Sequence, residues 1–440
     1  MDKVHIGLCI GTTNTTLTAL NLNRGEVVKS RSLASQRIDT QEAYSYCQDS
    51  HEIERVVGEL LDSVDEPWAS LTVTGQVHGI LYYDKQGKAL SPLYTWLDQR
   101  GLVELEGITS QQLLYQKGGV LLPSGYGFLT HYANVRMGKV PAGAVGFCGI
   151  LEYITGRLID QPLTACDTST LATYGGWSVV ERRFQQNLLN EVTNGLFLTP
   201  APPFSIAGYT QEGVTVACPV GDNQAGFLAM VESWEDTALV NVGTSGQISF
   251  FSRSAEGSPT LELRPFFDQG FLHVGATLTA GKAYENLQSF VKEILHAAGL
   301  AFSSEQVYAL MERVAKEETS LVVDPRFSGS RLEAWRRGSI ENITLDNFSL
   351  GDLVLATVDG VIDELLNFNS HCVEEIVATG SAFLKNRLFV NALVKKFPGV
   401  VTVAPLEDGA GLGAAIIGAL ATQELSLDNL PNIVQKIIGS

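Results

Sequence analysis

The sequence has 440 residues, of which 45% are apolar and 18% charged, so it can form two folded domains and is too apolar to be disordered. Lysine and arginine total 30 against 48 for aspartate and glutamate, a formal net charge of -18. Such an acidic chain is expected to repel nucleic acid backbones and anionic membranes, although it does not exclude a small anionic substrate.

The six cysteines are scattered and form no Cys-x-x-Cys pair, which argues against a zinc site and a disulfide framework. No charged-then-apolar leader begins the chain, and no apolar run reaches the ~18 residues of a membrane span. We therefore expect a soluble cytoplasmic protein with reduced thiols that binds neither nucleic acid nor membrane.

The chain opens with a predicted strand at 4–10, a polar turn, and a second strand at 15–20. The same pattern returns at 237–242 and 247–251, again around a turn rich in glycine and threonine. This half-chain repeat predicts two related domains, residues 1–230 and 231–440. The backbone N–H groups and hydroxyls of such turns can bind phosphate, whereas an ordinary hairpin is the alternative for each turn taken singly.

Between the two turns, the spacing predicts a helix at 52–61 and a strand at 70–74 that ends in a glycine-rich turn. His78 in that turn could donate to a sugar hydroxyl or be a satisfied turn histidine. Asp98, two residues before Arg100 and two after Trp96, suits polyol recognition, and a surface ion pair is the alternative.

Asp222 stands between Gly221 and Asn223 where a helix of small residues is predicted to begin. The positive end of a helix dipole favours a carboxylate there, which could act as a general base or simply cap the helix. Further on, a strand at 374–379 runs into a small-residue turn. The glycine- and alanine-rich segment 407–419 predicts a helix that packs very closely against another element.

Seven segments follow one another in the order found in the FGGY family of carbohydrate kinases, which the chain resembles from residue 4 to about residue 420. They are residues 10–13, 74–79, 95–100, 221–225, 241–245, 379–382 and 407–415. The resemblance implies two actin-like (ribonuclease-H-like) α/β domains with the active site in the cleft between them. It also implies transfer of the γ-phosphoryl group of ATP to a ketose hydroxyl with Mg²⁺, and a homodimer is possible.

By this resemblance, Asp222 is the catalytic general base. The residues expected to bind the ketose are Gln76, His78, Trp96, Asp98 and Asn223. The residues expected to bind ATP are Gly11, Thr12, Thr13, Asn14, Gly243, Thr244, Gly281, Gly380, Ser381 and Asn386. The pattern is most similar to sedoheptulokinases, which predicts sedoheptulose as substrate and its 7-phosphate as product; xylulokinases share several of these features, so a pentulose kinase is the alternative.

Cys9 departs from the family pattern, which has an aspartate two residues before the first glycine of the turn. A neutral thiol is a poor partner for hydrated magnesium, which prefers oxygen, and the metal ligands are therefore left unassigned. The alternatives are a weakened kinase, a metal held by other groups, a sugar-binding protein without efficient transfer, or a sequence altered at this position.

Overall fold

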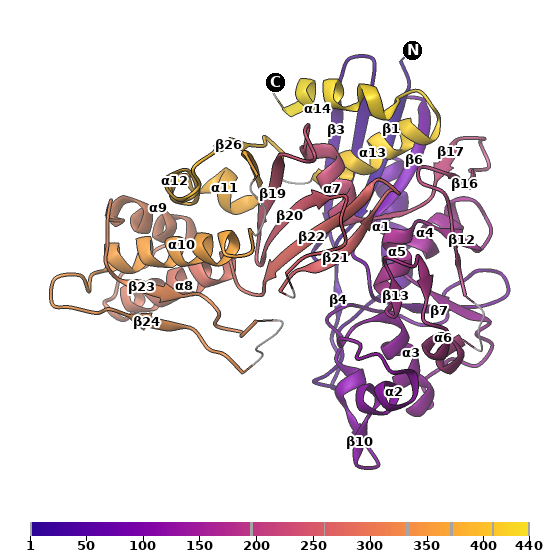
Figure 1. The fold of residues 1–440 in the computed structure, drawn as a ribbon, viewed down its shortest axis with the longest axis horizontal. Coiled ribbons are helices and arrows are strands. Elements are labelled where there is room, and N and C mark those ends of the chain that lie inside the picture. Colours follow the sequence, from indigo (N-terminus) through magenta and orange to yellow (C-terminus); the bar gives the residue numbers. More distant parts are fainter. Residues whose placement is uncertain are drawn as a thin grey trace. The chain divides into compact units, whose positions relative to one another are not determined.

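The computed structural model describes residues 2–193, 197–258, 260–330, 335–369, 373–406 and 409–438. The chain forms two compact units, which Figure 1 colours along the sequence. The first consists of Met1–Glu232, Arg264–Gly270 and Asp408–Ser440, and the second of Ser233–Leu263 and Phe271–Glu407. The predicted boundary after residue 230 lies two residues before the observed end of the first segment at Glu232. The prediction did not include the two later segments, Arg264–Gly270 and Asp408–Ser440, that belong to the first unit.

The first unit is built on a sheet with the strand order β16-β17-β6-β1-β2-β3, and β18 also pairs with β6. β1 pairs antiparallel with β2 and parallel with β6. The side chains of β1 alternate sides of the sheet yet are almost all buried, as expected of a central strand covered on both faces. The strands are β1 (Val4–Ile10), β2 (Asn14–Asn21), β3 (Glu26–Ala34), β6 (Trp68–Gly75), β16 (Ile206–Tyr209), β17 (Thr215–Ala217) and β18 (Val220–Gly221).

One face of this sheet is covered by α13 (Gly409–Ala421), which also packs against α7 (Asp222–Met230). Figure 1 shows α13 in yellow beside β1 and β6. A Cβ atom at Gly413 would lie 1.9 Å from the carbonyl oxygen of Ala225, so only glycine permits this approach of the two helices. The prediction that the glycine- and alanine-rich segment 407–419 forms a closely packed helix is confirmed from Gly409 onward, and residues 407 and 408 lie outside the described residues.

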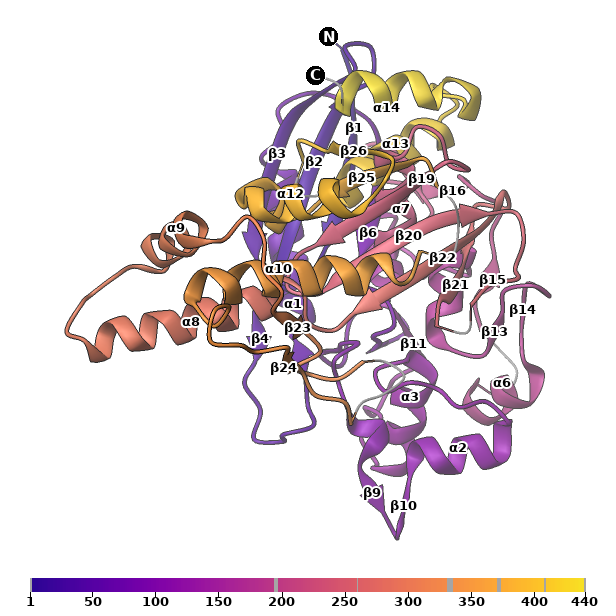
Figure 2. The same ribbon diagram turned by 60° about the vertical axis from the view of Figure 1, so that its left-hand side comes forward.

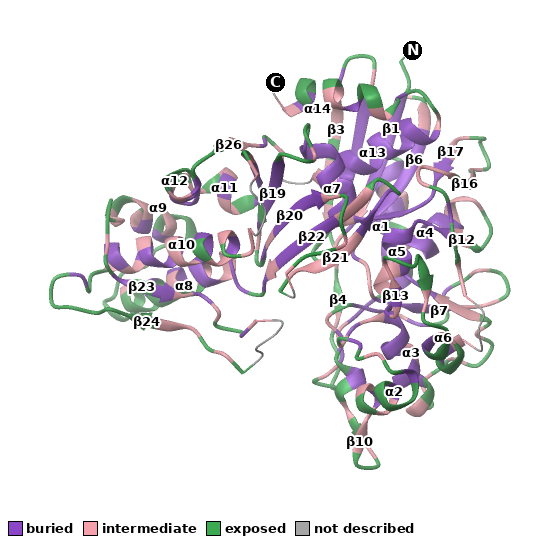
Figure 3. Ribbon diagram, viewed as in Figure 1, coloured by how far each residue is buried: buried purple, intermediate pink, exposed green. Residues whose placement is uncertain are grey.

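Smaller helices and ribbons of two or three strands complete the first unit, and Figure 3 shows where they are buried. The helices are α1 (Ser50–Leu61), α2 (Ser110–Gly118), α3 (Gly127–Arg136), α4 (Ile150–Leu158), α5 (Thr168–Leu171), α6 (Gln186–Thr193) and α14 (Leu430–Ile438). The ribbon strands are β4 (Arg37–Ile38), β5 (Cys47–Gln48), β7 (Leu81–Tyr83), β8 (Leu93–Tyr94), β9 (Glu104–Leu105), β10 (Ile108–Thr109), β11 (Gly146–Cys148), β12 (Ala165–Cys166), β13 (Trp177–Ser178), β14 (Arg183–Phe184) and β15 (Thr199–Pro200). The predicted helix at 52–61 is confirmed as α1, which begins two residues earlier because the side chain of Asp49 caps it.

The second unit repeats the sheet topology of the first. Its strands run in the order β22-β20-β19-β25-β26, with β19 antiparallel to β20 and parallel to β25. The first unit has the same succession in β3-β2-β1-β6-β17, so the predicted half-chain repeat is confirmed. The strands are β19 (Thr237–Val242), β20 (Gly246–Ser252), β22 (Gly270–Thr277), β25 (Glu375–Thr379) and β26 (Val400–Val403); β21 (Glu262–Phe266) leads into the segment that returns to the first unit.

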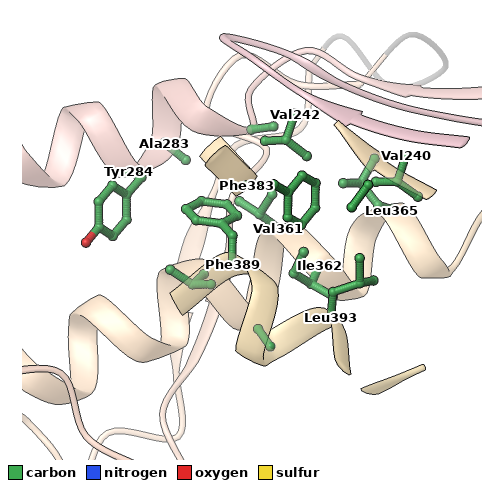
Figure 4. Close-up of a cluster of buried hydrophobic side chains, with 14 of the residues drawn as sticks. Val240, Val242, Ala283, Tyr284, Val361, Ile362, Leu365, Phe383, Phe389 and Leu393 are labelled. Carbon is green, nitrogen blue, oxygen red and sulfur yellow. The ribbon is translucent and has the colours of Figure 1, made fainter. Parts of the chain in front are cut away.

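Helices pack on the second sheet, and Figure 2 shows α10 running along it. They are α8 (Gly281–Ala297), α9 (Ser304–Val314), α10 (Leu350–Leu366), α11 (Ser381–Lys385) and α12 (Arg387–Lys396), beside the ribbon of β23 (Val322–Asp324) and β24 (Ser339–Glu341). Figure 4 shows the core between them, where Val240 and Leu365 pack together near Ile362. Within the described ranges, no helix is both long and apolar enough to span a bilayer.

Candidate active site

The first glycine turn joins β1 to β2 at Gly11, Thr12 and Thr13, and it ends at Asn14. The amide of Gly11 donates to the carbonyl oxygen of Asn14 at 2.8 Å, which closes the turn. Thr12 is half-buried, whereas Thr13 and Asn14 are exposed. The turn therefore presents backbone and hydroxyl donors at the end of the central strand, as phosphate binding requires.

Four side chains fix the back of this turn. Trp96 donates from Nε1 to Thr12 Oγ1 at 3.0 Å, and Thr12 donates to Gln76 Oε1 at 3.2 Å. Gln76 donates from Nε2 to Gln48 Oε1 at 2.7 Å, and Gln48 donates in turn to the carbonyl oxygen of Thr12 at 2.9 Å. Thr12, Gln76 and Gln48 thus form a hydrogen-bonded ring, and Trp96 bonds to it, so the structure brings together the three predicted residues Thr12, Gln76 and Trp96.

Gln48 is the member of this ring that the sequence did not single out. It is 1% exposed and lies in β5, immediately before Asp49, the residue that caps α1. The residues next to Gln48 in the sequence indicate only that Asp49 caps a helix. The hydrogen-bond partners of Gln48 are distant in the sequence, 36 residues before it and 28 residues after it. No signal in the sequence could have identified it.

Asp222 is the first residue of α7, directly after the short strand β18. Its Oδ1 accepts from the amide of Asn223 at 2.7 Å. The carboxylate therefore lies at the positive end of the helix, where negative charge is stabilised. Gly221 caps the helix through its backbone alone, so the alternative in which Asp222 is the N-cap residue is wrong.

His78 has a backbone φ of 74°, a conformation that side chains other than glycine rarely adopt. Its Nδ1 lies 2.9 Å from the carbonyl oxygen of Thr173, and its ring centroid lies 4.3 Å from that of Tyr126. Strained backbone held by several contacts is typical of a functional residue. The contact with a carbonyl makes Nδ1 the protonated nitrogen.

Asp98 lies in a different setting from the exposed ion pair that its sequence suggests. It is fully buried, and Arg100 is 1% exposed. Arg100 donates to both carboxylate oxygens of Asp98, from Nε at 2.7 Å and from Nη2 at 2.8 Å, and the amide of Tyr46 donates to Oδ2 at 3.0 Å. The expectation of a surface ion pair is therefore wrong, because the pair is in the core. A direct contact of Asp98 with substrate stays a prediction, while Trp96, at the start of the same turn, is 40% exposed.

The second glycine turn joins β19 to β20 in the second unit. Gly243 and Thr244 are held against the start of α8, since Gly281 donates to the carbonyl oxygen of Gly243 at 3.0 Å and Lys282 donates to that of Thr244 at 3.1 Å. A Cβ atom at Gly281 would lie 2.3 Å from the Gly243 oxygen. The structure thus places three predicted ATP-binding residues side by side in a shape that only glycine allows.

Gly380, Ser381 and Asn386 follow β25, the parallel neighbour of β19. Gly380 has a φ of 98°, and a Cβ atom there would lie 2.6 Å from the carbonyl oxygen of Val242, the residue before Gly243. Asn386 caps α12 by accepting from the amide of Leu388 at 2.9 Å. The predicted nucleotide residues of this unit therefore gather where β19 and β25 end, while their contact with ATP stays a prediction.

The thiol of Cys9 suits hydrated magnesium less well than the aspartate of the family pattern. Cys9 lies on β1, where its paired neighbours in the sheet are Thr16 of β2 and Thr74 of β6. Among the described residues, no group of three or more histidine, cysteine, aspartate or glutamate side chains is placed to hold a metal. Magnesium in such enzymes is usually bound through only one or two protein carboxylates together with substrate phosphates and water.

Comparisons with known proteins agree with this geometry. A family model for the N-terminal domain of the FGGY family of carbohydrate kinases matches residues 4–195. A xylulose kinase from Staphylococcus xylosus is 24% identical, and the match covers 95% of this chain and 91% of that protein. Both matches cover the first glycine turn, and the match to the xylulose kinase extends along nearly the whole chain.

Solved structures share the fold. Ligand-bound xylulose kinase from Lactobacillus acidophilus matches with a TM-score of 0.82 at 20% identity, covering 99% of this chain and 92% of that one. Plasmodium falciparum glycerol kinase with ADP matches with a TM-score of 0.76 at 16% identity, covering 98% and 92%. The predicted fold class, two actin-like α/β domains, is confirmed.

Proposed function

We propose that the chain is a carbohydrate kinase of the FGGY type and that it transfers the terminal phosphoryl group of ATP to a hydroxyl group of a ketopentose of the xylulose type. The observation that carries the choice of sugar is the similarity to a xylulose kinase along nearly the full length of both chains. Sedoheptulose, which the sequence pattern favours, stays a prediction that has no support among these relatives.

The residues of the first unit hold the ketose and accept its proton. Asp222 takes the proton of the attacking hydroxyl as that oxygen forms its bond to the γ-phosphorus and the bond from the γ-phosphorus to the bridging oxygen of ADP breaks. Its place at the start of α7 puts the carboxylate at the positive end of the helix, which favours negative charge. Gln76, His78, Trp96 and Asn223 orient the sugar hydroxyls.

The glycine turns orient the phosphates. Phosphoryl transfer requires in-line positioning and stabilisation of charge more than covalent participation by the protein. A turn whose backbone is already fixed, as the hydrogen bond from Gly281 to Gly243 fixes the second glycine turn, can do this without reorganisation during the reaction. A magnesium ion held mainly by the phosphates themselves would neutralise further phosphate charge.

The test is the release of ADP with a panel of ketoses that includes xylulose, ribulose and sedoheptulose. We expect the highest kcat/KM with xylulose and a loss of at least ~10²-fold in kcat in Asp222→Asn. Turnover only with sedoheptulose would overturn the choice of a pentulose. Near-normal turnover of the variant would remove Asp222 from its role.

A second candidate function follows from Cys9, since this residue carries a thiol where the family pattern has a carboxylate. In that case the protein binds the sugar without efficient transfer. Calorimetry with the same ketoses separates the two candidates, because binding without ADP release supports only the second.

A further inference from the structure

A short segment of the first unit, Asp167–Tyr174, contacts the junction at which the predicted general base is placed. It consists of α5 and the 3₁₀ turn Ala172–Tyr174. Asp167 caps α5 by accepting from the amide of Ser169 at 2.8 Å, and burial raises the pKa of its carboxyl group. Ser169 is 2% exposed, and its hydroxyl oxygen accepts from the amide of Gly221 at 3.0 Å. Ser169 therefore reaches the residue immediately before Asp222.

Two side-chain hydroxyls, those of Ser169 and Thr74, hold the peptide group between Val220 and Gly221 at both ends. The peptide that joins Val220 to Gly221 donates its N–H to Ser169, and its carbonyl oxygen accepts from the hydroxyl of Thr74 at 2.8 Å. Thr74 is fully buried, so water cannot replace either hydroxyl without a rearrangement. Because β18 has only two residues, the hydrogen bonds of these two side chains hold its backbone, as the backbone hydrogen bonds between longer strands do elsewhere in the sheet. The direction in which α7 begins is thereby fixed.

The same segment also holds the predicted sugar residue His78. Thr173 follows Ser169 by four residues, a spacing that places both on one side of a helical segment. Its carbonyl oxygen accepts from His78 Nδ1 at 2.9 Å. The segment Asp167–Tyr174 thus contacts both Gly221, which precedes the predicted general base, and His78, which is expected to bind the ketose.

We propose that Ser169 is a positioning residue for the general base, an inference that rests on the proposed function of Asp222. The hydroxyl of Ser169 fixes the peptide group before α7 and so sets the position of the Asp222 carboxylate relative to the bound hydroxyl. Displacement of a reacting group by about 1 Å can cost about 10²-fold in rate, so the loss of this contact should lower kcat. Ketose affinity should change little, because Ser169 is not among the residues expected to touch the sugar.

The experiment compares Ser169→Ala and Ser169→Thr with a matched control, Ser110→Ala. Ser110 is also fully buried in the first unit, and its hydroxyl also accepts one hydrogen bond, from Arg136 Nη1 at 3.1 Å. We expect Ser169→Ala to lower kcat at least about 10-fold while KM for the ketose stays within about twofold. Ser169→Thr should restore most of kcat because it keeps the hydroxyl, and the control should keep the activity of the unmodified protein.

Amide hydrogen exchange of a peptide that covers Gly221 provides a readout that does not depend on turnover. Exchange should be faster in Ser169→Ala than in Ser169→Thr. A kcat within twofold in Ser169→Ala, an equal loss in Ser110→Ala, or no recovery in Ser169→Thr would overturn the proposal. Unchanged exchange would show that the contact itself is wrong. Absence of turnover in the unmodified protein would instead refute the proposed function and, with it, the role of Ser169 in catalysis.

Discussion

The buried pair of Asp98 and Arg100 leads to a sharp prediction about stability. In Asp98→Ala, the guanidinium of Arg100 would keep Asn134, to which Nη1 donates at 2.6 Å, and the ring of Tyr94, whose centroid lies 3.8 Å away. It would lose both bonds to the carboxylate and leave a charge uncompensated in the core. Breaking a buried pair in this way costs about 3–5 kcal/mol of unfolding free energy.

The assay is thermal and denaturant unfolding of Asp98→Ala beside the double variant Asp98→Ala/Arg100→Met. For a unit of this size, about 2 °C of Tm corresponds to 1 kcal/mol, so Tm should fall by about 6–10 °C in the single variant. The double variant should recover much of this loss because no charge remains buried. A Tm unchanged within about 2 °C together with a raised KM for the ketose would refute this reasoning and identify Asp98 as a substrate contact. Equal instability of both variants would refute the explanation by an unpaired charge.

Three further predictions concern the metal position, a buried histidine and the nucleotide turn. Cys9→Asp should raise kcat at saturating magnesium and leave KM for the ketose nearly unchanged; an equal or lower rate would contradict this. Burial lowers the pKa of His131 to about 4, so the unfolded chain binds a proton that the folded protein does not, and stability should fall as the pH drops from 6.5 towards 4. His131→Gln should remove that part of the dependence, and an identical pH dependence of the unfolding free energy in both proteins would show that His131 does not contribute. Gly281→Val should raise KM for ATP at least about 10-fold because its side chain would meet the oxygen of Gly243, and an unchanged KM would separate this turn from the nucleotide.

Local patterns in the sequence were sufficient to find the elements that carry the predicted site. The strand predicted at 237–242 has the same bounds in the structure, and the turn at Gly243 follows it directly. Alternation of apolar residues and a glycine turn are features of neighbouring residues, so they can be read without knowledge of the fold. The same is true of Asp222 at a helix start, where the only error concerned which residue caps the helix.

Long-range packing accounts for what the sequence did not reveal. The sequence around Asp98 shows that Arg100 is near, but not that both are buried, because their surroundings come from residues 46 and 134. Gln48 and Ser169 are polar residues in unremarkable surroundings, and their partners lie 28 and 52 residues away. Polar residues of this kind are usually exposed, so only the tertiary structure distinguishes them.

The repeated topology explains why both halves carry a Thr-Gly pair in addition to their Gly-Thr turns. Thr74–Gly75 ends β6 beside β1, and Thr379 ends β25 beside β19 and is followed by Gly380. Each threonine hydroxyl donates to a backbone carbonyl in its own unit, Thr74 to Val220 at 2.8 Å and Thr379 to Leu406 at 3.0 Å.

The glycines of the two pairs are equivalent as well. Both have positive φ, 135° at Gly75 and 98° at Gly380, and a Cβ atom at either would lie within 2.6 Å of a backbone oxygen at the end of the neighbouring strand. Each pair thus lets the chain turn tightly beside the strand that leads into a Gly-Thr turn. Four features therefore match in the two sheets: the Thr-Gly pair, the threonine hydrogen bond to a backbone carbonyl, the positive φ of the glycine and its close approach to the neighbouring strand. A chance resemblance between two hairpins does not account for all four, so the Gly-Thr turns of the two units are structurally equivalent.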